Sequence, residues 1–191
     1  MQRERHFILG SNSPRRRELL AGLGIDFEVR VAKDVDESYP ATLVAEQIPL
    51  YISQQKAKAY VLSPDDVLIT ADTIVWLDGC VLGKPVDEAD AVRMLHQLSG
   101  QTHQVFTGVT IRFDGETHSF AAASDVTFDS LTDEEINYYV KNFRPLDKAG
   151  AYGIQEWIGY VGVTGLHGSY FNVMGLPVQK LYSELKKLHL I

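Results

Sequence analysis

Three arginines stand where the sequence predicts the first turn of a helix. In the segment SNSPRRREL, Ser13 and Pro14 are typical of a helix start, and Arg15 to Arg17 follow at once. The positive end of the helix dipole disfavours cations there by about 0.3–1 kcal/mol each. A bound anion would offset that penalty, because backbone N–H groups and guanidinium forks both favour phosphate oxygens. A solvated helix face, with Glu18 pairing to Arg15, is the alternative interpretation of this segment alone.

An acidic residue, Asp72, directly follows the apolar run VLITA at residues 67–71, which is typical of a buried strand. Ligands in α/β proteins commonly bind at the carboxyl ends of strands. A carboxylate there can hold Mg²⁺ or take a proton from water. An aspartate that only caps a turn is the alternative, and for Asp72 taken alone we favour it.

Two lysines lie in segments that could contact phosphate. Lys84, in LGKP, resembles a P-loop lysine, but the glycine spacing is one residue short and a proline replaces the required serine or threonine. Lys84 can therefore act only as a point charge on a phosphate. Lys148 stands in PLDKAGAYGIQ, a glycine-rich segment that could close over a ligand. From the residues alone we favour a turn-rich connection.

The composition limits the partners of the chain. The 18 basic and 25 acidic residues give a formal net charge of −7, so duplex nucleic acid and anionic membranes are not expected partners. The single cysteine, Cys80, permits no intrachain disulfide and no thiolate metal cluster. No apolar run reaches membrane-spanning length, and the first residues, MQRERHFILG, lack a secretory signal. We therefore expect a cytoplasmic protein.

Hydrophobic periodicity and turn signals predict a mixed-sheet α/β fold. The expected strands lie at 5–10, 27–32 and 67–71, and hairpins turn at Asp78-Gly79 and Asp114-Gly115. The expected helices lie at 13–22, at 42–62 with a second segment from Pro49, at 87–98, from the capping box at Thr132 to Phe143, and near the C-terminus. Gly162, Gly165 and Gly168 are typical of turns and bulges.

Six motifs together resemble the Maf family. They are SNSPRRRELL, the ADT at 71–73, GKP at 83–85, SGQTHQVFTGV, PLDKAGAYGIQ and GSYFNVMGLP, in order over nearly the whole chain. The resemblance implies a nucleoside triphosphate pyrophosphatase that cuts between the α and β phosphates. It also implies one domain over residues 1–191, with a mixed twisted sheet and flanking helices in two lobes around a cleft, as in inosine triphosphate pyrophosphatases. A homodimer and a divalent metal, Mg²⁺ or Mn²⁺, are further expectations.

Within that family, three positions separate the branches. The branch that prefers dTTP and UTP carries arginine, threonine and glutamine, which here are Arg15, Thr73 and Gln155. The branch that resembles 7-methyl-GTP pyrophosphatases carries tryptophan, glutamine and glutamate instead. The resemblance therefore implies a pyrimidine substrate. An amide such as Gln155 offers a donor and an acceptor, which could match the O4 and N3–H edge of thymine or uracil.

The resemblance also assigns roles to the candidate site residues. Asp72 is the expected proton acceptor, with Lys56 and Lys84 as further catalytic residues. The expected phosphate ligands are Ser11, Ser13, Arg16 and Lys148, and the expected metal ligands are Glu37 and Asp72. The loop before Glu37 varies in length within the family, so Asp36 is an alternative second ligand. Arg17 is expected on the surface, because neighbouring helical residues are 100° apart.

Two alternatives to this substrate and role remain open. Proteins that resemble this one are linked to arrest of septum formation and cell division, so the chain could be a nucleotide-binding regulator in which hydrolysis is incidental. Within the enzyme class, modified pyrimidine nucleotides such as pseudo-UTP or 5-methyl pyrimidine triphosphates fit the same three specificity residues.

Overall fold

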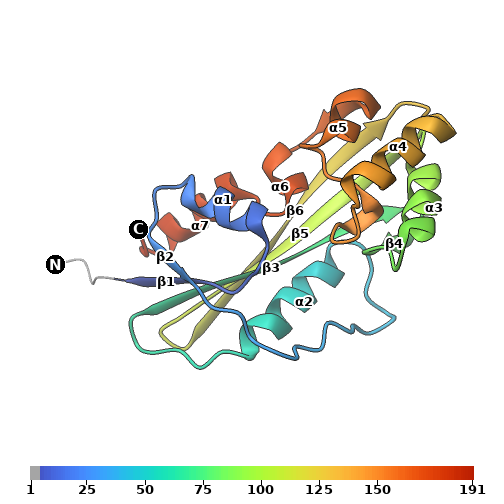
Figure 1. The fold of residues 1–191 in the computed structure, drawn as a ribbon. Helices are drawn as coiled ribbons and strands as arrows, with labels where there is room; N and C mark the ends of the chain where they lie inside the picture. The colour runs from blue at the N-terminus through green and yellow to red at the C-terminus, as the bar shows by residue number, and fades with distance from the viewer. Residues whose placement is uncertain (1–4) are drawn as a thin grey trace. The chain divides into compact units, whose positions relative to one another are not determined.

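The computed structural model describes residues 5–191 of the chain (Figure 1). The strands are β1 (His6–Leu9), β2 (Phe27–Val29), β3 (Asp66–Leu77), β4 (Cys80–Leu82), β5 (Thr102–Phe113), β6 (Glu116–Phe128) and β7 (Val163–His167). The α-helices are α1 (Pro14–Ala21), α2 (Gln47–Lys58), α3 (Glu88–Leu98), α4 (Asp133–Phe143), α5 (Trp157–Gly162), α6 (Tyr170–Met174) and α7 (Val178–Lys187), with a short 3-10 helix at Ala149–Ala151. Within these residues the strands form one mixed sheet in the order β2-β1-β3-β5-β6-β7, with β4 beside β3.

The chain divides into two compact units. Within the described residues, the first contains 5–72, 107–122 and 175–191, and the second contains 73–106 and 123–174. The three long strands β3, β5 and β6 contribute residues to both units.

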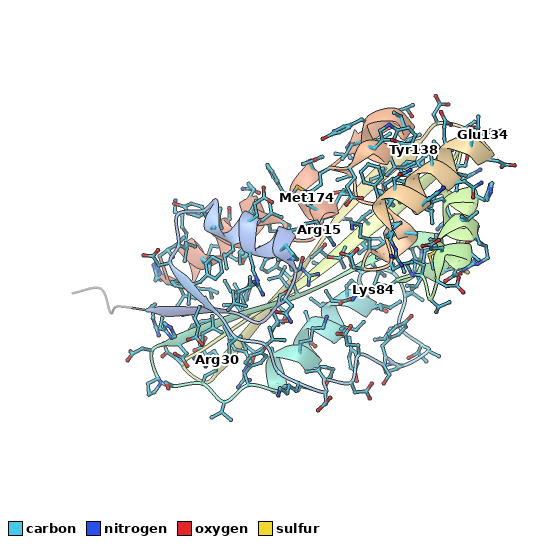
Figure 2. All side chains as sticks on the ribbon, in the orientation of Figure 1. Arg15, Arg30, Lys84, Glu134, Tyr138 and Met174 are labelled. Carbon is cyan, nitrogen blue, oxygen red and sulfur yellow. The ribbon has the colours of Figure 1, made fainter. Side chains whose placement is uncertain are left out.

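In the first unit, β1 lies between β2 and β3 and is parallel to both. Helices α1 and α7 lie on one side of these strands and α2 lies on the other (Figure 1). On the α2 side, Ile8 and Leu68 of the strands pack with Ala57 and Tyr60. Arg15 marks the first turn of α1 (Figure 2).

Helix α2 lies unusually close to β5. A Cβ at Gly108 would lie 2.4 Å from the backbone of Pro49 and Leu50, so only glycine fits under the helix. The buried Ser53 side chain donates to Leu50 O at 2.8 Å and shares a 2.8 Å hydrogen bond with Thr110. These contacts fix the position of α2 on the sheet, since its buried polar groups have partners there.

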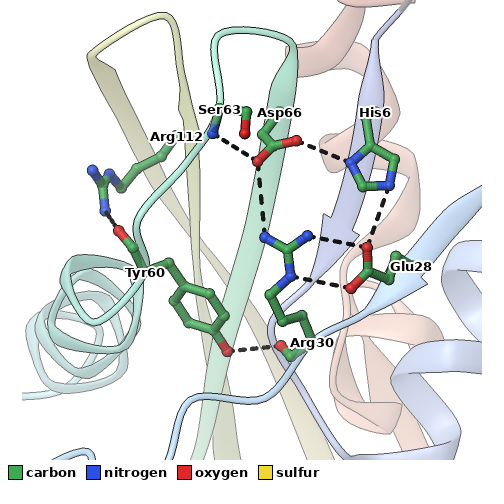
Figure 3. A network of polar contacts seen from close by, with 7 residues as sticks. All are labelled: His6, Glu28, Arg30, Tyr60, Ser63, Asp66 and Arg112. Atoms are coloured by element: carbon green, nitrogen blue, oxygen red, sulfur yellow. Dashed lines mark hydrogen bonds and ion pairs between the residues drawn. The ribbon is translucent and has the colours of Figure 1, made fainter.

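A polar network joins the start of β1 to β2 and β3 (Figure 3). The buried Asp66 carboxylate lies 2.9 Å from His6 Nδ1 and accepts the Ser63 N–H at 2.8 Å. Arg30 donates twice to Glu28, at 3.1 and 3.0 Å, and its Nη1 lies 3.8 Å from Asp66. The network therefore pairs a buried carboxylate with cationic and N–H groups from three chain segments.

In the second unit, helices α3 and α4 pack against each other. The rings of His103, Phe128 and Tyr152 form a buried edge-to-face cluster, with centroids 5.0–5.4 Å apart. His103 Nε2 and the Tyr152 hydroxyl share a 2.7 Å hydrogen bond, so His103 has a structural role in this cluster. This cluster anchors the segment that leads to Gln155, because Tyr152 lies three residues before it.

The predicted mixed α/β fold is confirmed, and most predicted elements are present. One strand prediction was wrong: β3 does not stop at Ala71 but continues to Leu77, so Asp72 lies inside a strand rather than after its carboxyl end. The strand continues because its second half pairs with β4, from Val75 opposite Leu82 to Leu77 opposite Cys80.

Three other boundaries differ from the sequence prediction. Helix α2 begins at Gln47 rather than at 42, because Ala45 has a left-handed φ of 48°. Pro49 starts no separate segment; it lies in the first turn of α2, where its missing N–H breaks no helical hydrogen bond. Strand β2 ends at Val29 instead of 32, and the glycine-rich segment from Gly162 contains strand β7, with a register shift opposite Thr127 and Phe128.

Candidate active site

Arg16, Ser13 and Ser11 lie together at the N-terminus of α1, in the first unit. Ser13 caps α1 by accepting the Arg16 N–H at 3.4 Å, as predicted. The Arg16 side chain donates from Nε to Gly175 O at 2.8 Å and from Nη1 to Ser11 Oγ at 3.4 Å. Ser11 is itself buried and also accepts the Ser13 N–H at 3.2 Å. Hydroxyls and a guanidinium therefore meet at one helix N-terminus, as an anion site requires.

The electrostatic surroundings of Arg16 include both predicted acidic residues. Burial lowers the pKa of Arg16 from its usual 12.5, and the neighbouring Arg15 charge lowers it further. Asp72 and Glu37 act in the opposite direction and raise it. The guanidinium thus lies within the field of two carboxylates and one like charge.

Lys56 joins the two predicted acidic residues in the same unit. Its Nζ, from α2, lies 2.7 Å from Asp72 Oδ1 on β3 and 3.3 Å from Glu37 Oε1 in the loop before α2. The Lys56 and Asp72 side chains are 16% and 14% exposed, whereas Glu37 is 54% exposed. Three of the predicted residues therefore meet at one point.

This arrangement fits a divalent cation. The carboxylates of Asp72 and Glu37 both contact the Lys56 ammonium, so they converge on a position that already holds positive charge. Mg²⁺ is usually bound by one or two carboxylates together with substrate phosphates. The described residues 5–191 contain no group of three or more acidic, histidine or cysteine side chains that could hold a metal alone. Asp36, the alternative ligand, accepts the Ser38 N–H at 2.8 Å, which lowers its pKa, whereas Glu37 contacts Lys56.

The second unit holds Lys148 between two carboxylates. Its Nζ donates to Asp147 Oδ1 at 2.8 Å and lies 3.2 Å from Glu156 Oε1. The Lys148 side chain is only 10% exposed. Glu156 in turn accepts a short hydrogen bond from the Tyr139 hydroxyl, so the ammonium belongs to a connected polar chain. A phosphate that uses Lys148 must compete with these two carboxylates.

The Gln155 side chain contains a buried polar atom. Its side-chain oxygen is buried and has no hydrogen-bond partner within residues 5–191. Such an atom costs about 1–3 kcal/mol unless something bonds to it, so a ligand group that reaches it would be favoured. The side-chain oxygen of Gln155 is therefore suited to accepting a hydrogen bond from a polar edge of a ligand.

The loop before Gln155 is tied to the GKP segment. Gly150 N donates to Gly83 O at 3.0 Å, directly before Lys84. Gly150 has a φ of 66°, and a Cβ there would lie 2.9 Å from Val75 Cγ2, so only glycine suits this position. The loop that carries Lys148 and the loop that carries Lys84 are thus linked through their backbones.

The remaining predicted residues lie as follows. Arg15 is half-buried on α1, and Thr73 is half-buried on β3, directly after Asp72. Lys84, labelled in Figure 2, is exposed. Arg17 is exposed, as expected, and donates to Asn12 at 2.9 Å. Motif reasoning missed Glu156, which contacts Lys148, and Tyr139, which donates to Glu156; no sequence pattern marked this pair.

The sequence of the chain is similar to one protein family and to several named proteins. The model of the family described as Maf-like protein matches residues 6–188. A dTTP/UTP pyrophosphatase of Phocaeicola vulgatus is 62% identical over 183 residues, which cover 95% of each chain. A protein of the same name from Porphyromonas gingivalis is 55% identical over 183 residues, which cover 94% of this chain and 92% of that one.

A solved structure shares the fold. A HAM1 protein from Coxiella burnetii aligns with 96% of this chain and 99% of its own at a TM-score of 0.52. The two sequences are only 11% identical, so the likeness concerns the mixed α/β architecture alone. None of the helices within residues 5–191 is both long enough and apolar enough to span a membrane.

Proposed function

The chain belongs to the Maf-like protein family, and from that premise we propose that it is a nucleoside triphosphate pyrophosphatase. It hydrolyses dTTP and UTP between the α and β phosphates and releases the monophosphate and pyrophosphate. The relatives at 55–62% identity carry the name dTTP/UTP pyrophosphatase, which supports this substrate class. The observation that carries the proposal is the convergence of Asp72 and Glu37 on Lys56, within the field of Arg16.

The phosphate chain needs cations that the acidic protein supplies locally. A triphosphate brings about four negative charges near neutral pH. Arg16 grips phosphate oxygens beside the hydroxyls of Ser11 and Ser13, and Lys56, Lys84 and Lys148 act as point charges. Arg16 is already oriented by its bond to Gly175 O, so little ordering is required when the anion binds.

Asp72 is the proposed proton acceptor from the attacking water. Its carboxylate is held by Lys56 at 2.7 Å on a β-strand, a rigid element that fixes the direction of the accepting oxygen. Phosphoryl transfer of this kind depends on positioning and electrostatics more than on covalent chemistry. Glu37 and Asp72 would hold a divalent cation, Mg²⁺ or Mn²⁺, which when bound offsets the charge of the phosphates.

The base is recognised through the three branch-specific residues. The Gln155 oxygen, buried without a partner in the described chain, would accept the N3–H of thymine or uracil. Cytosine presents an acceptor at N3 in place of the N3–H, so a cytosine bound in the same pose would leave the Gln155 oxygen unsatisfied. Arg15 and Thr73 complete the proposed specificity set. Modified pyrimidines that keep the N3–H edge would bind in the same way.

The proposal is tested on a panel of nucleoside triphosphates with Mg²⁺ or Mn²⁺. We expect kcat/KM for dTTP and UTP to exceed that for dCTP and CTP by at least about tenfold, as an unmet buried hydrogen bond predicts. Gln155→Leu, which lacks the accepting oxygen, should remove that preference. Preferred turnover of purine nucleotides would contradict the proposed specificity, and tight nucleotide binding with no turnover would favour a regulatory role.

Assembly and location are proposed on the resemblance alone. We propose a cytoplasmic homodimer, whose assembly is tested by light scattering after size-exclusion chromatography. A mass of about twice the 21.3 kDa chain would support the dimer, and a monomer at micromolar concentration would contradict it.

A further inference from the structure

The Glu156 carboxylate links two features of the proposed site. One oxygen, Oε1, lies 3.2 Å from Lys148 Nζ, and the other accepts a short hydrogen bond from the Tyr139 hydroxyl. The Lys148 and Glu156 side chains are 10% and 23% exposed, and Tyr139 is fully buried. Shielding from water strengthens both interactions relative to a surface pair. Glu156 is also the residue directly after Gln155.

Tyr139 connects the two ends of the turn that contains Gln155. Its hydroxyl accepts the Gly153 N–H at 3.0 Å while it donates to Glu156. Burial raises the pKa of Tyr139, and the bond to Glu156 raises it further, so the hydroxyl stays a donor at neutral pH. The turn is also closed directly, by the Glu156 N–H that donates to Gly153 O at 3.0 Å.

The size of residue 153 provides an independent observation. A Cβ at Gly153 would lie 2.9 Å from Glu156 Cδ and 3.1 Å from Lys148 Cε. The φ of Gly153 is not positive, so the backbone conformation does not demand glycine there. The atoms that a Cβ would meet belong to the ends of the Lys148 and Glu156 side chains, so this pair occupies the space over Gly153.

We propose that Glu156 is a positioning residue for the pyrophosphatase reaction, an inference that rests on the proposed function. It holds the Lys148 ammonium in place for the phosphates and, through Tyr139, fixes the turn that orients the Gln155 amide for the base. Without it, Lys148 would keep only its 2.8 Å contact with Asp147, whose side chain is 61% exposed. An exposed partner of that kind restrains a lysine weakly.

Two substitutions separate the two effects. Glu156→Gln keeps an acceptor for Tyr139 but removes the charge that holds Lys148, so kcat/KM should fall about tenfold for dTTP and dCTP alike. Tyr139→Phe keeps the ion pair but removes the hydroxyl that bridges Gly153 and Glu156, so the ratio of kcat/KM for dTTP over dCTP should fall about fivefold. Asp147→Asn, the matched control on the exposed partner of Lys148, should change either quantity less than about twofold.

A double-mutant cycle with Lys148→Met distinguishes positioning from general support of the fold. If Glu156 acts through Lys148, Glu156→Gln causes no further loss of kcat/KM in the Lys148→Met background. A loss of the same size in both backgrounds, or a wild-type kcat/KM for Glu156→Gln, would overturn the inference. A wild-type enzyme with no activity on dTTP would instead refute the proposed function, so the two failures are distinguishable.

Discussion

Lys56 Nζ lies 2.7 Å from Asp72 Oδ1 and ties helix α2 to the middle of strand β3. The two residues are 16 positions apart, and each side chain is mostly shielded from solvent. In the structure, the proposed proton acceptor therefore has a fixed cationic neighbour. The contact between Lys56 and Asp72 depends on how closely α2 approaches the sheet. Both the charge of Lys56 and the position of α2 can therefore be tested by substitution.

Lys56→Met should lower kcat/KM for dTTP by about 100-fold or more, because it removes the cation that contacts both Asp72 and Glu37. Lys58→Met is the matched control on the same helix, since Lys58 is exposed and forms no ion pair with residues 5–191. Steady-state kinetics on both variants checks the prediction. Equal losses in the two variants would mean that Lys56 matters only as one of several surface charges.

Gly108→Ala should destabilise the fold by about 2–4 kcal/mol, because the new methyl group would lie 2.4 Å from the backbone of α2. The matched control is Gly83→Ala, where a Cβ meets nothing within 4 Å and the backbone needs no left-handed conformation. Urea denaturation measures both free energies of unfolding. Similar values for the two variants would show that α2 can move away from β5 without loss.

His103 should make the free energy of unfolding depend on pH. Burial lowers its pKa from the usual 6.5 to about 4, so between these values the unfolded chain binds a proton that the folded chain does not. The contribution of His103 is thus present above pH 6.5 and is lost as pH falls toward 4, by about 3 kcal/mol in total.

His103→Gln keeps a partner for the Tyr152 hydroxyl but cannot titrate. The difference in unfolding free energy between wild type and His103→Gln should therefore shrink or reverse as pH falls from 6.5 to 4. Thermal denaturation across that range is the measurement. A difference that does not change with pH would contradict the buried, neutral state of His103.

Asp66 should make the free energy of unfolding depend on pH, because the pKa of its carboxyl group is lowered in the folded protein. Burial acts to raise its pKa, but the bonds to His6 and the Ser63 N–H, with the His6 and Arg30 charges, outweigh this and lower it from 3.8. Its contribution is therefore present above pH 3.8 and lost as pH falls below that value. Asp66→Asn should destabilise the protein by about 1–3 kcal/mol at pH 7 and by clearly less at pH 3. An equal loss at both values would show that shape, not charge, matters there.

Local signals predicted the starts of two helices, because caps act within one turn. Ser13 with Pro14 placed the start of α1, and the capping box of Thr132 and Glu135 placed the start of α4. The length of β3 was not predictable in this way, since polar Asp72 interrupts the apolar run and the strand is sustained by pairing with distant residues.

The candidate site likewise contains some residues that the sequence predicted and others that it did not. The family resemblance assigned Glu37, Lys56 and Asp72 to the site, and these residues do meet in the structure. The link between Glu156 and Tyr139 joins positions 17 residues apart through side-chain geometry, which no local pattern encodes. Tertiary contacts of that kind appear only once the chain is folded.

Product analysis of dTTP hydrolysis by the wild type and by Asp72→Asn shows which phosphoanhydride bond breaks and whether the reaction requires Asp72. We expect thymidine monophosphate and pyrophosphate from the wild type and a rate lower by at least about 100-fold in the variant, because the proton acceptor is lost. Thymidine diphosphate with orthophosphate, or undiminished hydrolysis by Asp72→Asn, would contradict the proposed mechanism.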